Sequence, residues 1–270
     1  MKVFDCFTFN DENHILEIRL NELDKYVDTF VIIEFGQNHQ GKNKGKKLSE
    51  DLLNQFKQKI KYFYFEKFES NLDSWKRESF QRNKITEGIK DSSDEDIIMI
   101  SDVDEIPDLK KIDLSKIYNY VYAFSQIHSM YKFNLLRNED WIGTKLCTKK
   151  TLSSPQWLRS LKVKKKYNIL RLDKYFSKTY YSKFKIIKEA GWHLGWLKTP
   201  DEIIEKINSY AHTEHNTLIN NDKNYIEQCI KENVSFLNPQ EKLNFIEKID
   251  FLPNYILKNK TIFKKWIKEK

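Results

Sequence analysis

Glycine and proline are scarce in this sequence, with 7 and 5 occurrences among 270 residues. A chain with so few glycines has little from which to build a glycine-rich phosphate loop. Neither G-x-x-x-x-G-K nor G-x-G-x-x-G occurs in it. Any binding of phosphate groups must therefore use a metal ion and basic side chains.

Cysteines and long apolar runs are also few. The three cysteines, Cys6, Cys147 and Cys229, are far apart and odd in number, which excludes a disulfide framework or a zinc site. No apolar run approaches the roughly 18 residues that span a bilayer, and a strand-like segment begins at Lys2 where a signal peptide would lie. We therefore expect a cytoplasmic protein that is soluble or peripheral at a membrane surface.

The composition is that of a folded globular protein with a basic surface. Hydrophobic residues make up 40%, and 47 basic against 39 acidic residues give a net charge of +8. The basic runs at 42–47, 162–166 and 258–270 are either solvated or attract a nucleotide-sugar, an acidic glycan or an anionic membrane. No helix-turn-helix, zinc-finger or RNP-type pattern accompanies them, so no nucleic acid partner is expected.

The first 107 residues alternate between strand and helix patterns. This alternation predicts an α/β fold with a doubly wound, mostly parallel sheet, whose strands end along one rim. The expected strands are 3–9, 30–34, 62–65 and 97–100, and the expected helices are 15–23, 48–60 and 73–91. Residues 36–47 are polar and basic and predict a loop.

The second half has a different character. Two adjacent strands rich in aromatic residues are expected at 121–127 and 130–136, and helices at 201–215, 225–233 and 240–249. No linker separates the halves, which predicts a single domain over 1–255, with a nucleotide-binding half (1–107) and a mixed acceptor half (108–255). The basic amphipathic tail, 256–270, either lies on an anionic membrane, where lipid-linked acceptors would be found, or packs on its own domain.

The segment from Asp96 to Pro107 carries the clearest chemical pattern. A buried strand, Ile97 to Ile100, is followed by Asp102, Asp104 and Glu105. If the chain stays extended, the two aspartates share one face and would repel each other unless a cation lies between them. Mg²⁺ and Mn²⁺ typically bind through one or two carboxylates and substrate phosphates, and α/β sheets bind ligands at this end of their strands. The alternative is a solvated acidic turn that caps the next helix.

Two charged residues lie where apolar ones are expected. Arg82 falls on the apolar stripe of the helix expected over 73–91, beside Ile85 and Ile89. It either extends its charged end into solvent or points a cation at an anion beside the acidic strand end. Glu34 ends the second strand and suits a contact to a ribose or a base.

A late aromatic segment contains further candidates. His193 is either a packed histidine or a residue of the active site, with His212 and His215 as alternatives. Trp192 and Trp196 either offer flat faces to an acceptor sugar or pack in the core.

Several segments together resemble glycosyltransferase family 17 over roughly residues 1–255. They are Asp5-Cys-Phe-Thr-Phe, Leu16-Glu-Ile-Arg-Leu-Asn-Glu-Leu23, Val31-Ile-Ile-Glu34, Gln81-Arg-Asn83, Ile100-Ser-Asp-Val-Asp-Glu-Ile-Pro107, Gly191-Trp-His-Leu194 and Ser209-Tyr-Ala-His-Thr-Glu-His215. Their order and spacing are much more specific than the acidic motif alone.

This resemblance implies a GT-A fold and an inverting transfer of a sugar, GlcNAc, from UDP-GlcNAc to a hydroxyl of a glycan or lipid-linked glycan. It further implies that Asp104 holds Mn²⁺ or Mg²⁺ and that Asp102 holds the ion or the ribose. Arg82 and Asn83 would contact the nucleotide-sugar, and His193 would supply a late ligand to the metal.

Inversion also requires a general base on the acceptor hydroxyl. The sequence does not single it out, and Asp140, Glu189 and Asp201 are the candidates. Asp201 is alternatively the N-cap of the helix after Pro200.

Two other functional classes use the same features. A metal-dependent phosphohydrolase or nucleotidyltransferase would use the same carboxylates without transferring a sugar. A non-catalytic glycan-binding module would use the aromatic residues alone.

Overall fold

A mixed β-sheet forms the centre of the computed structural model, which describes residues 1–162, 181, 183–211, 214 and 216–270. Four strands of the amino-terminal half are parallel, in the order β3-β2-β1-β4. They are β1 (Val3–Phe9), β2 (Thr29–Phe35), β3 (Ile60–Phe65) and β4 (Ile97–Asp102). These are the four strands that the alternating pattern predicts, and the α/β class is confirmed.

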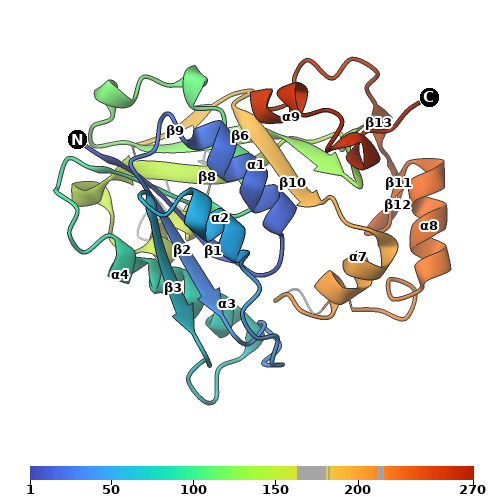
Figure 1. The fold of residues 1–270 in the computed structure, drawn as a ribbon, viewed down its shortest axis with the longest axis horizontal. Helices are drawn as coiled ribbons and strands as arrows, with labels where there is room; N and C mark the ends of the chain where they lie inside the picture. The colour runs from blue at the N-terminus through green and yellow to red at the C-terminus, as the bar shows by residue number, and fades with distance from the viewer. Residues whose placement is uncertain (163–180, 182, 212–213, 215) are drawn as a thin grey trace, which may run out of the picture.

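Helices cover both faces of this parallel part of the sheet (Figure 1). On one face lie α1 (Asn13–Leu23) and α2 (Glu50–Gln55); on the other lie α3 (Ser74–Asn83), α4 (Ile85–Gly88) and α5 (Pro155–Ser160). Side chains alternate along β1, so Phe7 and Phe9 pack with α1 while Phe4 and Cys6 pack with α4 and α5. Coverage on both faces explains why these strands are almost continuously apolar.

The second half continues the same sheet in a mixed arrangement. The central strand of this half, β6 (Val121–Met130), is antiparallel to β7 (Lys132–Leu136) and β8 (Trp141–Thr148). It is parallel to β9 (Phe184–Ile187) and β10 (Gly191–Trp196). Because β8 pairs antiparallel with β4, the start of β8 is brought to the carboxyl end of β4. The short β5 (Glu105–Pro107) pairs with β10.

Four of the expected helices differ from those observed, and the one expected over 201–215 ends at Ile207. The helix expected over 48–60 is only α2, and the one over 73–91 is divided into α3 and α4. The prediction of a helix over 240–249 is wrong, because the chain forms β12 (Asn238–Lys242) and β13 (Asn244–Phe245) there. β12 pairs with β11 (Val234–Ser235) and β13 pairs with β7, so hydrogen bonding to strands takes the place of a helix. Tertiary pairing has overridden local helix propensity there.

Two helices pack beyond the end of β10. They are α7 (Pro200–Ile207) and α8 (Lys223–Glu232), and they share a separate apolar cluster with Met130, Trp196 and Phe236. A capping box closes the start of α7, where the side chains of Thr199 and Glu202 each bond the other's backbone N–H.

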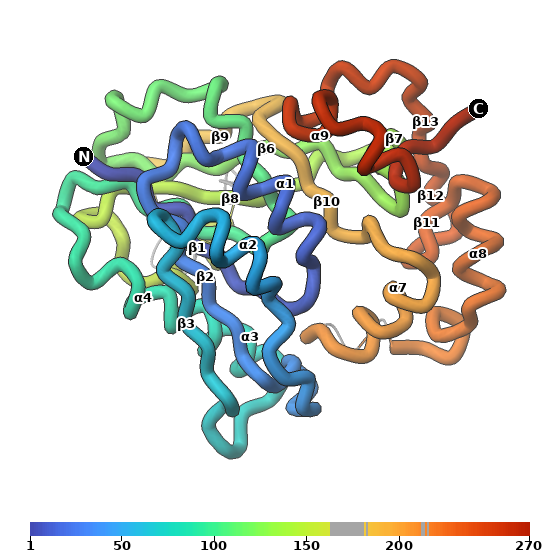
Figure 2. The backbone as a smooth tube through the Cα atoms, in the orientation of Figure 1, coloured from blue at the N-terminus to red at the C-terminus, as the bar shows by residue number. Residues whose placement is uncertain are grey.

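The carboxyl-terminal tail packs on its own domain. After α9 (Asn254–Lys258) the chain returns past α1 towards β13, as Figure 2 shows. Ile256, Phe263 and Trp266 are buried, and the Trp266 ring stacks on His14 of α1 with ring centroids 5.3 Å apart. The apolar side of the tail is therefore covered by the protein, which favours packing over membrane contact. Among the described residues, no helix is long and apolar enough to cross a membrane.

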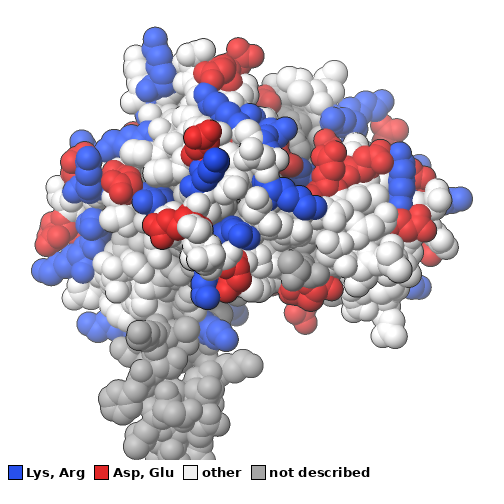
Figure 3. Space-filling model, turned by 90° about the horizontal axis from the view of Figure 1, so that it is seen from below, with Lys and Arg blue, Asp and Glu red and all other residues white. Residues whose placement is uncertain are grey.

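Charge is distributed without a single-sign surface on the face shown in Figure 3. Lysine and arginine side chains there are interspersed with aspartate and glutamate. Of the basic run 162–166, all but Lys162 lies outside the described residues.

Candidate functional site

The acidic motif at the end of β4 is held in place by a buried arginine of α1. Arg19 pairs with Asp5 of β1, with 2.6 Å between Nη2 and Oδ1. Its Nη1 donates to the main-chain carbonyls of Asp102, Val103 and Glu105 at 3.1, 3.2 and 2.8 Å. One guanidinium thus fixes the backbone of the whole motif.

Asp102 projects from β4 towards α3 and α5 and is held by two arginines. Arg82 Nη2 lies 3.0 Å from its Oδ1, and Arg159 Nη2 lies 2.8 Å from its Oδ2. Burial opposes ionisation, but Arg159 and then Arg82 outweigh it and lower the pKa of Asp102. The carboxylate stays ionised between two cations.

Asp104 has different neighbours. The chain turns at Val103 and Asp104, so the extended path on which the two aspartates share a face does not continue. Lys206 of α7 places Nζ 3.2 Å from Asp104 Oδ2, and His193 Nε2 lies 3.8 Å from Oδ1. Burial raises the pKa of Asp104, and Lys206 opposes that rise. Lys206 also pairs with Glu12 at 3.0 Å.

Glu105 is buried and connects the motif to the acceptor half. It accepts hydrogen bonds from Arg159 Nη2 at 2.7 Å and from Trp141 Nε1 at 2.6 Å. The arginine that holds Asp102 is therefore also held by Glu105. These contacts make Asp102, Glu105 and Arg159 one ionic cluster.

His193 lies between the motif and two other rings. It stacks on Trp141, with ring centroids 4.7 Å apart, and its centroid is 4.3 Å from that of His128. Burial lowers the pKa of His193 to about 3, so its imidazole is neutral at physiological pH. Its Nδ1 has no hydrogen-bond partner among the described residues.

Arg82 and Asn83 join α3 to α5. Arg82 is only 1% exposed, which rules out an end extended into solvent, and its Nη1 donates to Gln156 Oε1 at 2.7 Å. Its Nη2 also pairs with Glu78 at 2.6 Å. Asn83 Oδ1 accepts from the Gln156 backbone N–H at 3.0 Å. Of this pair, only Arg82 reaches the acidic motif in the contacts observed.

Glu34 lies at the same rim but its carboxylate is occupied. It accepts from Lys44 Nζ at 2.8 Å, from the Lys47 backbone N–H at 2.7 Å and from Tyr62 Oη at 2.8 Å. These bonds anchor the loop 36–47, so the observed contacts of Glu34 are structural.

The three base candidates lie in different surroundings. Asp140 directly precedes Trp141 and accepts a hydrogen bond from Ser125 Oγ at 2.7 Å. Glu189 occupies an exposed turn before β10 with φ of 49°. Asp201 is exposed in the first turn of α7 and pairs with Lys223 at 2.7 Å. The N-cap of α7 is Thr199, so the alternative role suggested for Asp201 is wrong.

The two tryptophans expected to bind an acceptor are core residues. Trp192 and Trp196 are 6% and 7% exposed. Trp192 Nε1 donates to the Phe251 carbonyl at 2.7 Å, and Trp196 packs edge-on against Phe236. Their packing favours the core alternative. His212 and His215 lie outside the described residues.

Sequence reasoning missed four residues of this site, and only one of them could have been found. Arg19 lies among the apolar residues of its helix, the same sign that singled out Arg82. The others meet the motif only through long-range packing, for which the sequence holds no local pattern. The four are Arg19, Trp141, Arg159 and Lys206.

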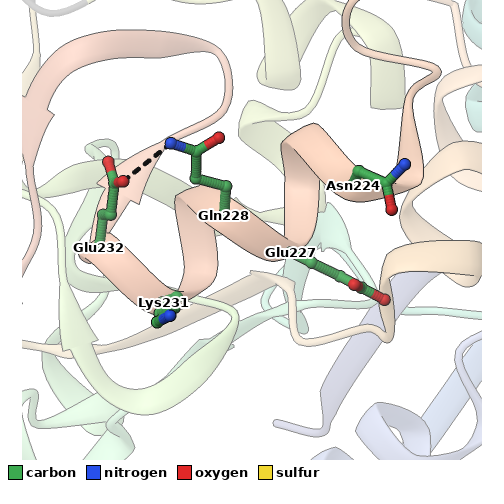
Figure 4. Close-up of a pocket in the computed structure, with 5 residues that line it drawn as sticks. All are labelled: Asn224, Glu227, Gln228, Lys231 and Glu232. Atoms are coloured by element: carbon green, nitrogen blue, oxygen red, sulfur yellow. Dashed lines mark hydrogen bonds between the residues drawn. The ribbon is translucent and has the colours of Figure 1, made fainter.

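A surface hollow elsewhere does not compete with this site. A hollow of about 410 Å³ lies along α8. Figure 4 draws the residues that line it, Asn224, Glu227, Gln228, Lys231 and Glu232. All five residues belong to one exposed helix, and none contacts the acidic motif.

Comparisons with known proteins agree with the sequence resemblance. The sequence pattern described as Glycosyltransferase family 17 matches residues 1–265. This chain belongs to glycosyltransferase family 17. The rat, mouse and human proteins named beta-1,4-mannosyl-glycoprotein 4-beta-N-acetylglucosaminyltransferase are each 24% identical to it over 284 residues, covering 96% of this chain and 53% of theirs. The family 17 chain thus spans about half the length of these curated relatives.

Two solved structures show weak similarity. HddC from Yersinia pseudotuberculosis matches with a TM-score of 0.35 and 12% identity, covering 70% of this chain and 92% of HddC. An active-site mutant of LgtC matches with a TM-score of 0.31 and 14% identity, covering 69% of this chain and 72% of LgtC. At these scores the likeness carries no functional conclusion.

Proposed function

We propose that this family 17 chain is a GT-A-type inverting glycosyltransferase that moves GlcNAc from UDP-GlcNAc to a glycan hydroxyl. The observation that carries the proposal is the acidic motif at the end of β4, in which Asp104 and Glu105 are buried and Asp102 is partly exposed. Three cations surround it: Arg82, Arg159 and Lys206. In the transfer, the bond between the sugar C1 and the diphosphate oxygen breaks as the acceptor oxygen bonds to C1. Charge develops on the leaving UDP, and fixed cations stabilise it.

The two arginines suit the diphosphate. A guanidinium binds phosphate oxygens through two parallel hydrogen bonds, and both arginines are already held close to the strand end. Arg82 also keeps Glu78 and Gln156 as partners, so it has a fixed position from which to bind. Arg159 would exchange part of its contact with Asp102 for a phosphate oxygen.

We further propose that the site binds a divalent cation together with the nucleotide-sugar. Asp102, Asp104 and the neutral imidazole of His193 offer oxygen and nitrogen ligands, and Gly195 leaves room between the last two, since a Cβ there would lie 2.8 Å from His193 Nε2. Within the described residues no group of three or more such side chains is already gathered into a site. Phosphate oxygens would therefore complete the ligand set, as is usual for Mg²⁺ and Mn²⁺. When bound, the ion neutralises charge on the departing diphosphate.

Asp140 is our candidate for the general base. It directly precedes Trp141, whose ring stacks on His193, whereas Asp201 is paired on the outer side of α7. A carboxylate in this position would take the proton of the acceptor hydroxyl as its oxygen attacks C1. The hydrogen bond from Ser125 Oγ orients this carboxylate.

A donor screen tests the proposal. Purified protein is incubated with UDP- and GDP-sugars and Mn²⁺, with a mannose-containing N-glycan as acceptor, because the mammalian relatives are named for a β-1,4-mannosyl-glycoprotein. We expect release of UDP from UDP-GlcNAc, which stops when EDTA removes the metal. Release of UMP or phosphate in place of UDP would favour a phosphohydrolase, and no release from any donor would contradict a transferase.

A further inference from the structure

One tryptophan of the site remains partly open to solvent. Trp141, the first residue of β8, is 37% exposed, whereas Trp192 and Trp196 are buried. One face of its ring is covered by His193, at an interplanar angle of 23°, and His128 meets it edge-on at 5.6 Å. The exposed third of this residue therefore lies away from these two histidines.

The exposed ring is held in a fixed orientation. Its Nε1 donates to Glu105 Oε1 at 2.6 Å, and Glu105 is in turn fixed by Arg159. A buried carboxylate that fixes the plane of an exposed tryptophan indicates that the orientation of the ring matters for function. An aromatic side chain already held in place loses little conformational entropy when a ligand stacks on it.

The position of the ring relates it to the proposed reaction. His193 lies between Trp141 and Asp104, with its Nε2 3.8 Å from Asp104 Oδ1. Only the His193 side chain therefore lies between the indole and the carboxylate of Asp104, which is proposed to act at the diphosphate. The carboxylate of the preceding residue, Asp140, adjoins it in the chain.

An exposed aromatic ring of fixed orientation is suited to binding a pyranose ring. A sugar presents an apolar face of C–H groups and a rim of hydroxyls, so a flat aromatic surface and an adjacent carboxylate bind both parts. The donor is expected to be held mainly through its diphosphate and nucleotide, which leaves the acceptor most dependent on such a surface. The acceptor also has to place one hydroxyl next to a base, and the base candidate Asp140 directly precedes Trp141 in the chain.

We propose that Trp141 is the platform on which the acceptor sugar stacks, in place of the buried Trp192 and Trp196. This inference rests on the proposed glycosyltransferase function. It assigns Trp141 to the acceptor and not to the sugar that is transferred.

The experiment compares Trp141→Ala and Trp141→Phe with the wild type, using the mannose-containing N-glycan as probe. Two rates are measured: transfer to the glycan, and release of UDP from UDP-GlcNAc in water alone. We expect Trp141→Ala to raise KM for the glycan at least about fivefold, which corresponds to about 1 kcal/mol, and Trp141→Phe to raise it less. The rate of UDP release in water, and KM for UDP-GlcNAc, should change by a smaller factor than KM for the glycan, because the ring is assigned to the acceptor and not to the donor.

Tyr118→Ala is the matched control, since this aromatic side chain is 66% exposed and is not one of the residues described at the site. An unchanged KM for the glycan in Trp141→Ala overturns the inference, and so does an equal fall in both rates, which would place the transferred sugar on the ring. If the wild type itself releases no UDP, the proposed function fails before the role of Trp141 is reached.

Discussion

At the scale of single residues, the site is a set of largely buried ions that balance one another. Asp102 lies between two arginines, and Glu105 shares one of them. Removing one member of such a cluster leaves its partners charged and buried, which is far more destabilising than losing a surface ion pair. These residues therefore contribute to both stability and chemistry.

Arg19 is the residue for which we expect the largest loss of stability. Arg19→Met leaves Asp5 buried without its cation and frees three carbonyls of the acidic motif. We expect the free energy of unfolding to fall by about 3–5 kcal/mol. Urea titration followed by far-UV circular dichroism measures this loss.

The control for Arg19 is another arginine pair with partial exposure. Arg137 makes two hydrogen bonds to Glu241, at 2.8 and 2.6 Å, with the arginine side chain a quarter exposed. Arg137→Met should therefore cost clearly less than Arg19→Met. Equal losses in the two variants would show that Arg19 is not the organiser of the motif.

Predictability from sequence differs among these residues. Asp102, Asp104 and Arg82 stand out because their types conflict with an apolar strand or helix face, and the structure brings all three to one rim. The environments of Trp141 and Trp196 could not be told apart, because both are aromatic residues in strands. Their exposure depends on which segments cover them, and α7 and residues near Phe236 cover Trp196 alone.

At the scale of elements, the attachment of α5 to β8 decides where Arg159 lies. Lys145 of β8 is buried and donates to the carbonyls of Arg159 and Leu161 at the end of α5. Burial lowers the pKa of Lys145 to about 7, with Arg159 adding to that effect. A neutral amine still has two N–H groups for the two carbonyls, so loss of the proton does not break the attachment.

This pKa predicts a dependence of stability on pH. The pKa of Lys145 is lowered in the folded state, so between about pH 7 and its usual value of 10.5 the unfolded chain binds more protons. Stability should therefore rise with pH in that window, by at most about 1.4 kcal/mol per pH unit from this group. We expect the urea midpoint of the wild type to increase from pH 7 to pH 9 relative to that of Lys145→Met. Parallel pH profiles of the two proteins would contradict a lowered pKa.

Helices and strands could be predicted from the sequence where burial alone determines the residue pattern. The strands of the parallel sheet are buried on both faces, and their continuous apolar runs predict them. The segment 240–249 lacks such a signature, since its strands lie at the edge and their side chains are mostly solvated. Its pairing partners, β11 and β7, are chosen by the tertiary fold and not by its own sequence.

At the scale of the whole molecule, the tail completes the apolar core of the first half. Trp266 and Phe263 join the cluster that contains α1 and β1, although more than 200 residues separate them in the chain. The periodicity of the tail shows an apolar side but not what covers it. The apolar side of the tail could be covered by a membrane or by the protein's own core, and these two hypotheses predict opposite effects of a mutation.

The variant Trp266→Ala distinguishes these two hypotheses. If the ring is part of the core, we expect the variant to lose about 3–5 kcal/mol of unfolding free energy. Ile262→Ala, four residues away and 64% exposed, should change it by less than about 0.5 kcal/mol. Thermal and urea unfolding measure both. A stable Trp266→Ala protein that no longer sediments with anionic vesicles would instead support the membrane alternative.

The central claim is that the carboxylates at the end of β4 act on a nucleotide-sugar. The most direct measurement is the rate of UDP release from UDP-GlcNAc with Mn²⁺ by Asp104→Asn, compared with Asp91→Asn, an exposed aspartate distant from the site. We expect Asp104→Asn to lose at least about 100-fold in rate, because a charge-stabilising group at the leaving diphosphate is removed, while Asp91→Asn retains the wild-type rate. A folded Asp104→Asn protein that releases UDP as fast as the wild type would contradict the account.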